Sequence, residues 1–471
     1  SGDLYNASLE VPYYLETLTT GNPMTGRWEA QCDSGVALAT LTTEQLTALE
    51  ATVTEENAAT HALCQSIGLA NYGIDTERHL TKYNPLPVTK STETIAVQVT
   101  LPNETAANTF RAAAGLAGTI AKPEAGWPVV ILQHGITSRK EDSLAITGWL
   151  SANGFATVAI DHPVHGSRSF EIPSADGSGS GVYISASGAT DSEGNAVYPG
   201  NSATAYLNLP SLLTGRDNLR QSVADGLKLR LALNAFYDGS NGTVAVDPTQ
   251  VFYAGHSLGA MTGTNLLAVA NTPTGNDALD ALYNIKAGVL AKPGASIANF
   301  LLESAAFGPL VHAMVNYAAG TEVSAAISAN IQNISTVDPT DPDVVSVLRN
   351  NLGRGEGASS SCLALAGGST SETDALICAY EEFYAGATAE QMAIVAGTLQ
   401  EFAFAAQMAI EAGDPTNYAQ LLRATQTPIL MFEITGDGEE NLPDQVIPNT
   451  VSTDPFNMIG GTTGLANQLG L

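Results

Sequence analysis

Apolar and polar residues follow regular patterns through much of the chain. Period-two alternation indicates a strand that one face of a sheet buries, and a short continuous apolar run is typical of a strand buried on both faces of a parallel sheet. Apolar residues at spacing four indicate helices. These patterns predict strands at 94–101, 129–132, 155–160 and 251–254, and helices at 143–153 and 219–235. Strand and helix therefore alternate, which predicts a mostly parallel, doubly wound α/β sheet with its ligand site at the carboxyl ends of the strands.

The remaining segments lack this alternation and are predicted to be additions to the sheet. Residues 1–90 form a predicted N-terminal extension packed on the core, with a helix within 41–63. Residues 170–210 are rich in Gly, Ser, Ala and Asn, which indicates a long surface loop. We expect four parts: the extension 1–90, a first core part 91–295 that ends after a strand at 287–291, an alanine-rich helical cap 296–425, and a second core part 426–471 that begins with a strand at 427–432.

A Gly-x-Ser-x-Gly pentapeptide, Gly255 to Gly259, lies directly after one of the predicted strands. In the α/β-hydrolase fold this motif forms a sharp turn from strand to helix, where the nucleophile takes a strained backbone and its neighbours must lack bulky side chains. The strand at 251–254 and the apolar helix that follows Ala260 supply both flanks. The sequence therefore predicts Ser257 as the nucleophile. The alternative is a glycine-rich turn that contains an incidental serine.

Attack on an ester creates an oxyanion, which needs two backbone N–H donors. Leu258, the residue after the nucleophile, is the first predicted donor. The second is expected from the segment 133–136, which directly follows the strand at 129–132, and within it Ile136 is favoured over Gly135. His134 precedes the nucleophile by more than a hundred residues, so we expect a structural role for it. The motif 161–166, Asp-His-Pro-Val-His-Gly, is expected to shape a loop rather than to catalyse or bind metal.

The acid of such a site follows the nucleophile in sequence and lies in the loop after a later strand. The loop after the strand at 427–432 contains several acidic residues. We predict Asp444 as the acid because Val446, Ile447 and Pro448 return to apolar packing immediately after it and would hold it in place. Asp437 is the alternative, and the acidic residues near it otherwise form a solvated loop.

Composition narrows the class of partner. Lys and Arg total 18 against 47 Asp and Glu, and the net charge of −29 makes binding to nucleic acid or to an anionic membrane surface unfavourable. The four cysteines form two local couples, Cys32 with Cys64 and Cys362 with Cys378, which favours two disulfides and an oxidising compartment; the alternative is four unrelated thiols. No Cys or His spacing suggests a metal site, and we expect no cofactor.

Several further motifs accompany the serine pentapeptide over nearly the whole chain: Val-Pro-Tyr-Tyr-Leu at 11–15, Leu-Gln-His-Gly-Ile-Thr at 132–137, Ala-Ile-Asp-His-Pro at 159–163, Arg-Asp-Asn-Leu-Arg-Gln at 216–221 and Pro-Asp-Gln-Val-Ile-Pro-Asn at 443–449. In these motifs the chain resembles the bacterial extracellular lipases of the virulence-factor lipase group, which includes surface lysophospholipases. The resemblance implies a secreted or surface-anchored enzyme of the α/β-hydrolase type. It also implies cleavage of acyl esters, including lipids or lysophospholipids, without a cofactor, and transient contact with lipid aggregates. Acyl chain length and oligomeric state stay open.

A predicted cap would cover Ser257 and present apolar side chains to the acyl group of such a substrate. Within 296–425, five apolar residues recur at helical spacing: Met392, Val395, Leu399, Phe402 and Met408. The alternative is that they form the internal core of the cap.

The histidine that should take the proton from Ser257 is missing from its usual place. Nucleophile, acid and histidine normally follow one another in sequence, yet no histidine follows Asp444. We expect the natural polypeptide to continue past Leu471 and to carry this histidine there, with His312 as the alternative within the chain. Two other functions remain open, a non-catalytic hydrolase-like binding domain and a serine peptidase on the same fold.

Overall fold

The structure is a computed structural model, and it describes residues 1–174, 181–188, 197, 202–237, 242–335, 360–366, 371–451 and 459–471. Contacts within it divide the chain into two compact units. Unit 1 comprises residues 1–290 and 421–430, and unit 2 comprises residues 291–420 and 431–471. Each unit is described by itself. Much of the loop predicted at 170–210 lies outside the described residues.

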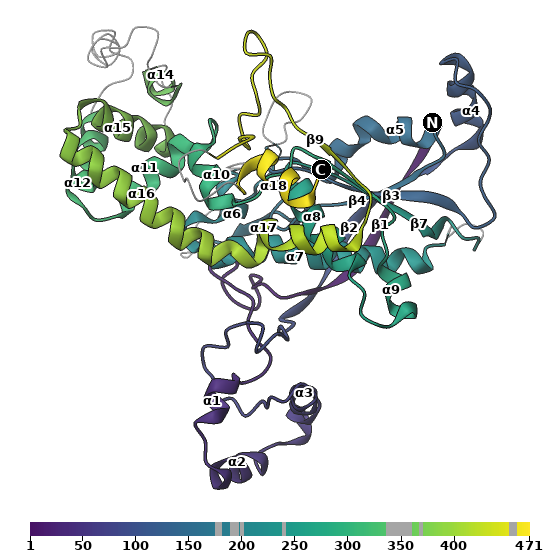
Figure 1. Cartoon of the computed structure of the whole chain (residues 1–471), viewed down its shortest axis with the longest axis horizontal. Helices are drawn as coiled ribbons and strands as arrows, with labels where there is room; N and C mark the ends of the chain where they lie inside the picture. The colour runs from purple at the N-terminus through teal and green to yellow at the C-terminus, as the bar shows by residue number, and fades with distance from the viewer. Residues whose placement is uncertain are drawn as a thin grey trace. The chain divides into compact units, whose positions relative to one another are not determined.

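A seven-stranded sheet forms the core (Figure 1). Its strands in spatial order are β1 (Gly2–Tyr13), β2 (Ser91–Pro102), β4 (Ala156–Ile160), β3 (Trp127–Gln133), β7 (Val246–His256), β8 (Gly288–Ala291) and β9 (Ile429–Phe432). Strand β2 is antiparallel to both of its neighbours, β1 and β4, whereas β3 is parallel to β4 and to β7. A mostly parallel sheet in this order, with one antiparallel strand near its edge, is an α/β-hydrolase fold. The predicted fold class is confirmed.

Helices cover both faces of the sheet, as the side-chain alternation of its strands shows. Phe252 and Ala254 of β7 and Leu150 of helix α5 (Leu144–Ala152) pack against the same buried cluster of Val130, Leu132 and Ala159. Tyr253 points the other way, because successive side chains of a strand lie on opposite faces. Its hydroxyl donates to the Gly259 carbonyl oxygen of helix α8 (Leu258–Asn271) at 2.5 Å. The sheet is therefore doubly wound, with α5 and α8 on opposite faces.

The helices of unit 1 follow the predicted pattern in the core and depart from it near the N-terminus. The helix expected at 143–153 is α5, which ends before Gly154 at φ +82°. The apolar stripe expected at 219–235 lies on helix α7 (Leu212–Ala232), except for its last residue, Ala235, which lies in the 3-10 turn that follows. The single helix expected within 41–63 is two helices, α2 (Thr43–Glu50) and α3 (Glu55–Gln65), each with its own N-terminal capping box. The smaller elements are α1 (Gly35–Ala39), α4 (Glu104–Ala113), β5 (Phe170–Ile172), β6 (Val182–Ile184), α6 (Thr204–Leu207) and α9 (Asp277–Tyr283), with short 3-10 turns at Lys140–Ser143, Gly166–Arg168, Leu209–Ser211 and Leu233–Ala235.

Part of the predicted N-terminal extension belongs to the sheet itself. Strand β1 pairs with β2 along its full length, from Gly2 opposite Pro102 to Tyr13 opposite Ser91. The segment that follows is held by the Cys32–Cys64 disulfide and by the buried carboxylate of Asp33. That carboxylate accepts hydrogen bonds from the amides of Tyr72, Gly73 and Asp75 and pairs with Arg78. This segment buries few apolar residues. The disulfide and the hydrogen-bonded, ion-paired carboxylate of Asp33 therefore contribute much of its stability.

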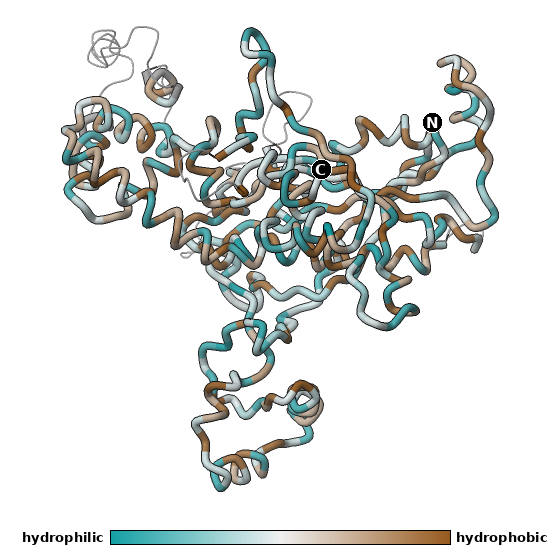
Figure 2. The backbone as a smooth tube through the Cα atoms, viewed as in Figure 1, coloured by the Kyte–Doolittle hydropathy of each residue, from teal (hydrophilic) through white to brown (hydrophobic). Residues whose placement is uncertain are grey.

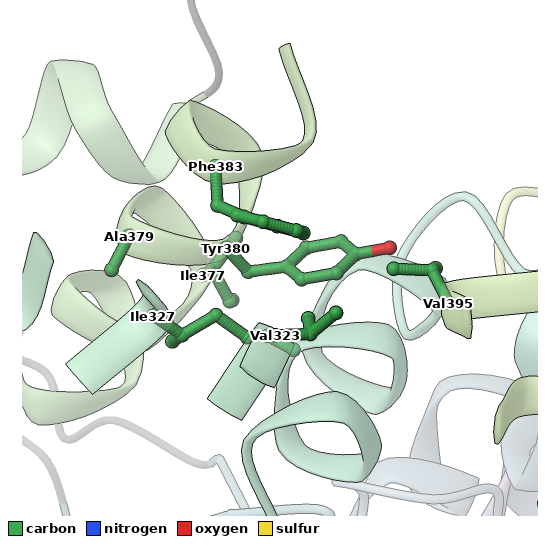
Figure 3. Close-up of a cluster of buried hydrophobic side chains, with 8 residues drawn as sticks. Val323, Ile327, Ile377, Ala379, Tyr380, Phe383 and Val395 are labelled. Atoms are coloured by element: carbon green, nitrogen blue, oxygen red, sulfur yellow. The ribbon is translucent and has the colours of Figure 1, made fainter. Parts of the chain in front are cut away.

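Unit 2 is mainly helical and has a hydrophobic core of its own. Its helices are α10 (Ile297–Glu303), α11 (Gly308–Ala318), α12 (Glu322–Ser335), α14 (Ser360–Ala366), α15 (Glu372–Gly386), α16 (Ala389–Ile410) and α18 (Gly461–Leu469), a 3-10 turn follows at Glu411–Gly413, and α17 (Thr416–Thr425) runs across the boundary between the units. Figure 3 shows the ring of Tyr380 beside Phe383, with its hydroxyl oxygen directed toward Val395, in a cluster that includes Val323 and Ile327. The expected Cys362–Cys378 disulfide ties α14 to α15. Coverage of Ser257 by this unit stays a prediction.

Unit 2 also contains an unusually apolar helical stretch, as the colouring of Figure 2 shows. By length and composition alone, residues Ala389–Thr425 could cross a membrane, and only 17% of the most apolar window is buried in the described chain. The helix pair Ile297–Glu303 and Gly308–Ala318 meets the same criterion only if it is taken as one span bent by 105°. One or two helices of this kind are weak evidence, so these features assign no membrane span.

A buried ion pair connects three segments of unit 1. Arg168 donates from Nη1 to the Asp225 carboxylate of α7 at 2.6 Å and to the Asp161 carbonyl oxygen at 3.0 Å. The guanidinium lies 5.7 Å from the centre of the Tyr13 ring of β1. Gln221 Nε2 donates to the other Asp225 oxygen at 2.8 Å. Both charged side chains are nearly inaccessible to solvent, at 9% and 1% exposure.

We predict that Asp225→Asn destabilises the protein strongly because it leaves the Arg168 charge buried without a partner. The free energy of unfolding, measured by urea titration, should fall by about 3 to 5 kcal/mol. The control is Asp277→Asn, which removes an exposed carboxylate at the start of α9 and should change stability by less than about 1 kcal/mol. Equal effects of the two substitutions would contradict a structural role for the ion pair.

Candidate active site

Ser257 lies at the turn between the end of β7 and the start of α8. Its backbone has φ 52° and ψ −116°, which is a strained conformation for a residue that has a Cβ atom. The side chain is 8% exposed, so it is almost buried but still reachable. Strain at a single residue persists only where the surrounding structure enforces it, and the neighbouring glycines show how that happens here.

The two glycines of the pentapeptide are required by lack of space. A Cβ atom at Gly255 would lie 2.3 Å from the Gly259 carbonyl oxygen. A Cβ atom at Gly259 would lie 2.3 Å from the Gln133 carbonyl oxygen and 2.6 Å from that of His134. These distances are far below van der Waals contact, so only glycine allows the turn to close against itself and against the loop after β3.

The loop after β3 therefore passes directly beside Ser257. A Cβ atom at Gly135 would lie 3.1 Å from the Ser257 Cβ atom and 3.0 Å from the His256 ring. Leu258 is the first residue of α8, where N–H groups have no acceptor within the helix and the helix dipole favours negative charge. The segments that carry both predicted oxyanion donors, Leu258 and Ile136, thus meet at Ser257. Their donor roles stay a prediction.

His134 fixes the orientation of the peptide that contains the Ile136 N–H. Nε2 of His134 accepts from the His162 amide at 3.1 Å, so the proton of the neutral ring lies on Nδ1, which donates to the Gly135 carbonyl oxygen at 2.8 Å. In a planar trans peptide the carbonyl and the next N–H point to opposite sides. With the Gly135 carbonyl held on the His134 side, the Ile136 N–H is directed away from His134.

Three buried histidines form a ring cluster next to this loop. The ring centres of His134 and His162 lie 4.7 Å apart, and those of His134 and His165 lie 5.1 Å apart. His162 Nδ1 is 2.9 Å from the Ser222 hydroxyl, which also contacts the Tyr206 hydroxyl at 2.8 Å. Within the described part of the chain, no group of three or more His, Cys, Asp or Glu residues has the geometry to hold a metal ion.

The histidines of this cluster are held in the uncharged form. Burial lowers the pKa of His134, and the nearby Asp161 carboxylate opposes that change only in part. Burial also places the pKa of His162 well below its ordinary value and lowers that of His165 to about 3. A general base near neutral pH needs a pKa close to 7, so these rings do not suit that task. The arrangement agrees with the loop-shaping role expected for 161–166. The support that His134 gives to the peptide after Gly135 was not foreseen.

The two candidate acids differ in how their carboxylates are used. Asp444 accepts from the amides of Val446 and Ile447 through Oδ1 alone, at 2.8 and 3.0 Å, and among the described residues nothing donates to its Oδ2. Ile447 is 2% exposed and anchors this segment. Asp437 instead spends both oxygens on its own turn, accepting from Glu439 and Asn441. One fixed oxygen and one open oxygen suit an acid that must orient a histidine, so the geometry favours Asp444.

Among the described residues, neither the histidine cluster of unit 1 nor His312 of unit 2 is bonded as a general base would be. The rings of His134, His162 and His165 are hydrogen-bonded to neighbouring backbone groups. In unit 2, the His312 ring is hydrogen-bonded to the Leu302 backbone and lies 6.3 Å from the Tyr380 ring, and it makes no hydrogen bond with Asp444. Burial lowers the pKa of His312. Ser257 belongs to unit 1 and Asp444 to unit 2.

The buried His165 ring should make stability fall in acid. An unfolded chain protonates this ring below about pH 6.5, whereas the folded chain does so only near pH 3, so protons favour unfolding between these values. We predict that the free energy of unfolding decreases as the pH falls through this window, by about 1.4 kcal/mol per pH unit for this ring. Urea titrations at several pH values measure this dependence. The free energy of unfolding of His165→Gln should change less steeply with pH than that of the wild type. The exposed His79→Gln serves as control and should keep the wild-type slope; equal slopes for all three proteins would refute the assignment.

Comparisons with known proteins yield structural likeness only. No protein-family model matches the chain, and no curated protein sequence matches it. A solved structure described as a lipase in its open form matches 72% of this chain and 75% of its own, with 16% identity and a TM-score of 0.26. The ferulic acid esterase from Streptomyces cinnamoneus matches over 43% and 53%, with 16% identity and a TM-score of 0.24. TT1662 from Thermus thermophilus matches over 42% and 52%, with 18% identity and a TM-score of 0.18, so the chain spans about half the length of these last two. At such values the likeness supports no argument about activity, and the α/β-hydrolase fold stands on the order and direction of the strands.

Proposed function

We propose that the protein is a serine carboxylic ester hydrolase, an esterase or lipase that acts through an acyl-enzyme on Ser257. The observation that carries this proposal is the strained turn at Ser257, which is packed against the loop after β3 at the start of α8. Such a turn presents a hydroxyl beside two sets of backbone donors. A glycine-rich turn with an incidental serine would have no need for backbone strain at the serine itself.

The residues can be assigned to the steps of ester cleavage. Ser257 Oγ attacks the ester carbonyl carbon while a histidine takes its proton, and the N–H groups of Leu258 and Ile136 stabilise the resulting oxyanion. The intermediate collapses to an acyl-serine, and the alcohol leaves with the proton from the histidine. Water then attacks the acyl-serine by the same route and releases the carboxylic acid. Asp444 orients that histidine.

The substrate class and compartment follow from the resemblance to extracellular lipases and from the charge of the chain. An uncharged acyl ester suits a chain with a net charge of −29 better than an anionic one does. The two disulfides support an oxidising, extracellular location. We therefore propose a secreted or surface-attached enzyme for acyl esters, with lipid esters and lysophospholipids included.

Labelling and turnover test the nucleophile together. A fluorophosphonate probe should label the protein at Ser257, as read by peptide mass spectrometry. Ser257→Ala should abolish labelling and reduce kcat/KM for p-nitrophenyl esters by at least about 10⁴-fold. Ser66→Ala, at the exposed end of α3, is the matched control and should retain wild-type values. If the wild-type protein neither reacts with the probe nor cleaves any of a series of p-nitrophenyl esters with increasing acyl length, it is a binding domain. Faster cleavage of amides than of esters would indicate a peptidase.

A pair of conservative substitutions tests the acid. Asp444→Asn should lower kcat for ester cleavage by about 10³- to 10⁴-fold, because an amide cannot stabilise the protonated histidine. Asp437→Asn alters a carboxylate in the same loop and should leave kcat within about threefold of wild type. The reverse ranking would assign the acid to Asp437, and two inactive variants with normal thermal stability would mean that the whole loop is needed.

A further inference from the structure

Unit 2 contains a cavity formed by its own helices. Its volume is about 570 Å³, within the range of sites for small organic ligands. Every lining residue lies in unit 2, on α10, α11, α15 and α16 or in the short link between α10 and α11. The cavity is lined by Leu302, Ser304, Gly308, Pro309, His312, Tyr380, Glu381, Tyr384, Met392, Val395, Ala396 and Leu399.

One part of the wall is apolar and comes mostly from α16. Met392, Val395 and Leu399 recur at spacing three to four, so they share a face of that helix. Leu302 and Pro309 add apolar surface from α10 and α11. The sequence predicted that Met392, Val395 and Leu399 would contact an acyl group, and here they line a cavity within their own unit. A surface of this kind suits an alkyl chain.

The other part of the wall is formed by aromatic rings and a carboxylate. The rings of Tyr380 and Tyr384 are stacked, with centres 5.9 Å apart and an angle of 28° between them. The His312 ring meets Tyr380 edge-on at 6.3 Å. Glu381 lies between the two tyrosines in sequence, and its Oε2 is buried with no hydrogen-bond partner among the described residues. A buried carboxylate oxygen without a partner is unfavourable, so a ligand cation placed there would stabilise it.

The charge around the cavity also selects a cation. Among the residues that the structure describes, no Lys or Arg lines it. Burial lowers the pKa of His312, which keeps that ring uncharged near neutral pH. The sequence of unit 2 contains only three Lys or Arg residues, Lys292, Arg349 and Arg354, and the described one, Lys292, is not in the lining. An anionic ligand would therefore meet a carboxylate without a compensating positive charge, whereas a cation would meet aromatic faces and a carboxylate.

We propose that this cavity binds an organic cation that carries an alkyl chain, of the quaternary ammonium kind. The ammonium group contacts Tyr380, Tyr384 and Glu381, and the chain lies along the apolar wall from α16. This combination of aromatic faces and a carboxylate is the general mode by which proteins recognise quaternary ammonium groups. The proposal rests on the lining of the cavity and not on the proposed function, so failure of one leaves the other standing.

Calorimetric titration of the protein with octyltrimethylammonium, kept below its micelle-forming concentration, is the direct test. We expect saturable binding, weaker binding of tetramethylammonium, which lacks the chain, and no binding of octanoate. Octylphosphocholine separates two sources of the same cation. If octylphosphocholine binds as tightly as octyltrimethylammonium, the natural ligand is a lipid headgroup. If octylphosphocholine does not bind, the carboxylate repels its phosphate and the natural ligand is a free alkylammonium ion. Equal affinity for octyltrimethylammonium and octanoate would overturn the proposal.

Three variants locate the site. Glu381→Gln should weaken octyltrimethylammonium binding about tenfold, and Tyr384→Leu about fivefold, because a half-exposed ring is removed from the cation. Glu382 is the next residue of α15, and its carboxylate does not line the cavity. Glu382→Gln should therefore leave the affinity for octyltrimethylammonium unchanged. Thermal unfolding of each variant shows that the helices remain folded. Unchanged affinity in Glu381→Gln, or an equal loss in Glu382→Gln, would refute the assignment.

Discussion

Close backbone contact between two turns is the constraint on which the candidate site depends. Where Gly259 opens α8, its backbone lies so near the loop after β3 that a single added carbon would collide with the Gln133 and His134 carbonyl oxygens. This contact forces Ser257 into its strained conformation, because the chain must leave β7 and enter α8 within one residue. It also joins the two segments that carry Leu258 and Ile136. The position of the nucleophile and the positions of the oxyanion donors therefore have one cause. The neighbouring parallel strands β3 and β7 end at the same edge of the sheet.

The parts of the fold that the sequence predicted well are those in which burial is complete. A strand covered on both faces must be apolar throughout, so 129–132, 155–160 and 251–254 could be assigned without any knowledge of their neighbours. Strand β1 could not. As an edge strand it mixes polar residues such as Asn6 and Ser8 with exposed Leu4 and Tyr5, so neither a clean alternation nor an apolar run marks it. The break between α2 and α3 depends on local capping at Thr54 rather than on periodicity.

The site shows the same division between local and long-range information. The pentapeptide identified Ser257 because the turn imposes its own residue types. The role of His134 depends instead on which atoms its two nitrogens contact, and one of these is the amide of His162, which comes from the loop after another strand. Likewise the sequence separates Asp444 from Asp437 only by the apolar residues that follow Asp444, whereas the structure adds which carboxylate oxygens are occupied. The identity of a general base is a relation between distant side chains, so no local motif could supply it.

Charge gives the two candidate sites opposite preferences. Ester cleavage converts an uncharged substrate into a carboxylate, and a chain with a net charge of −29 does not repel the former but does repel the latter. The acidic surface would then favour release of the product over its retention, without any specific contact. In the cavity of unit 2 the same excess of carboxylates has the reverse effect, because a cation is retained where an anion is expelled. Scarcity of Lys and Arg, more than abundance of acid, produces both effects, since only 14% of the residues are charged and few basic side chains are available to pair with the acidic ones.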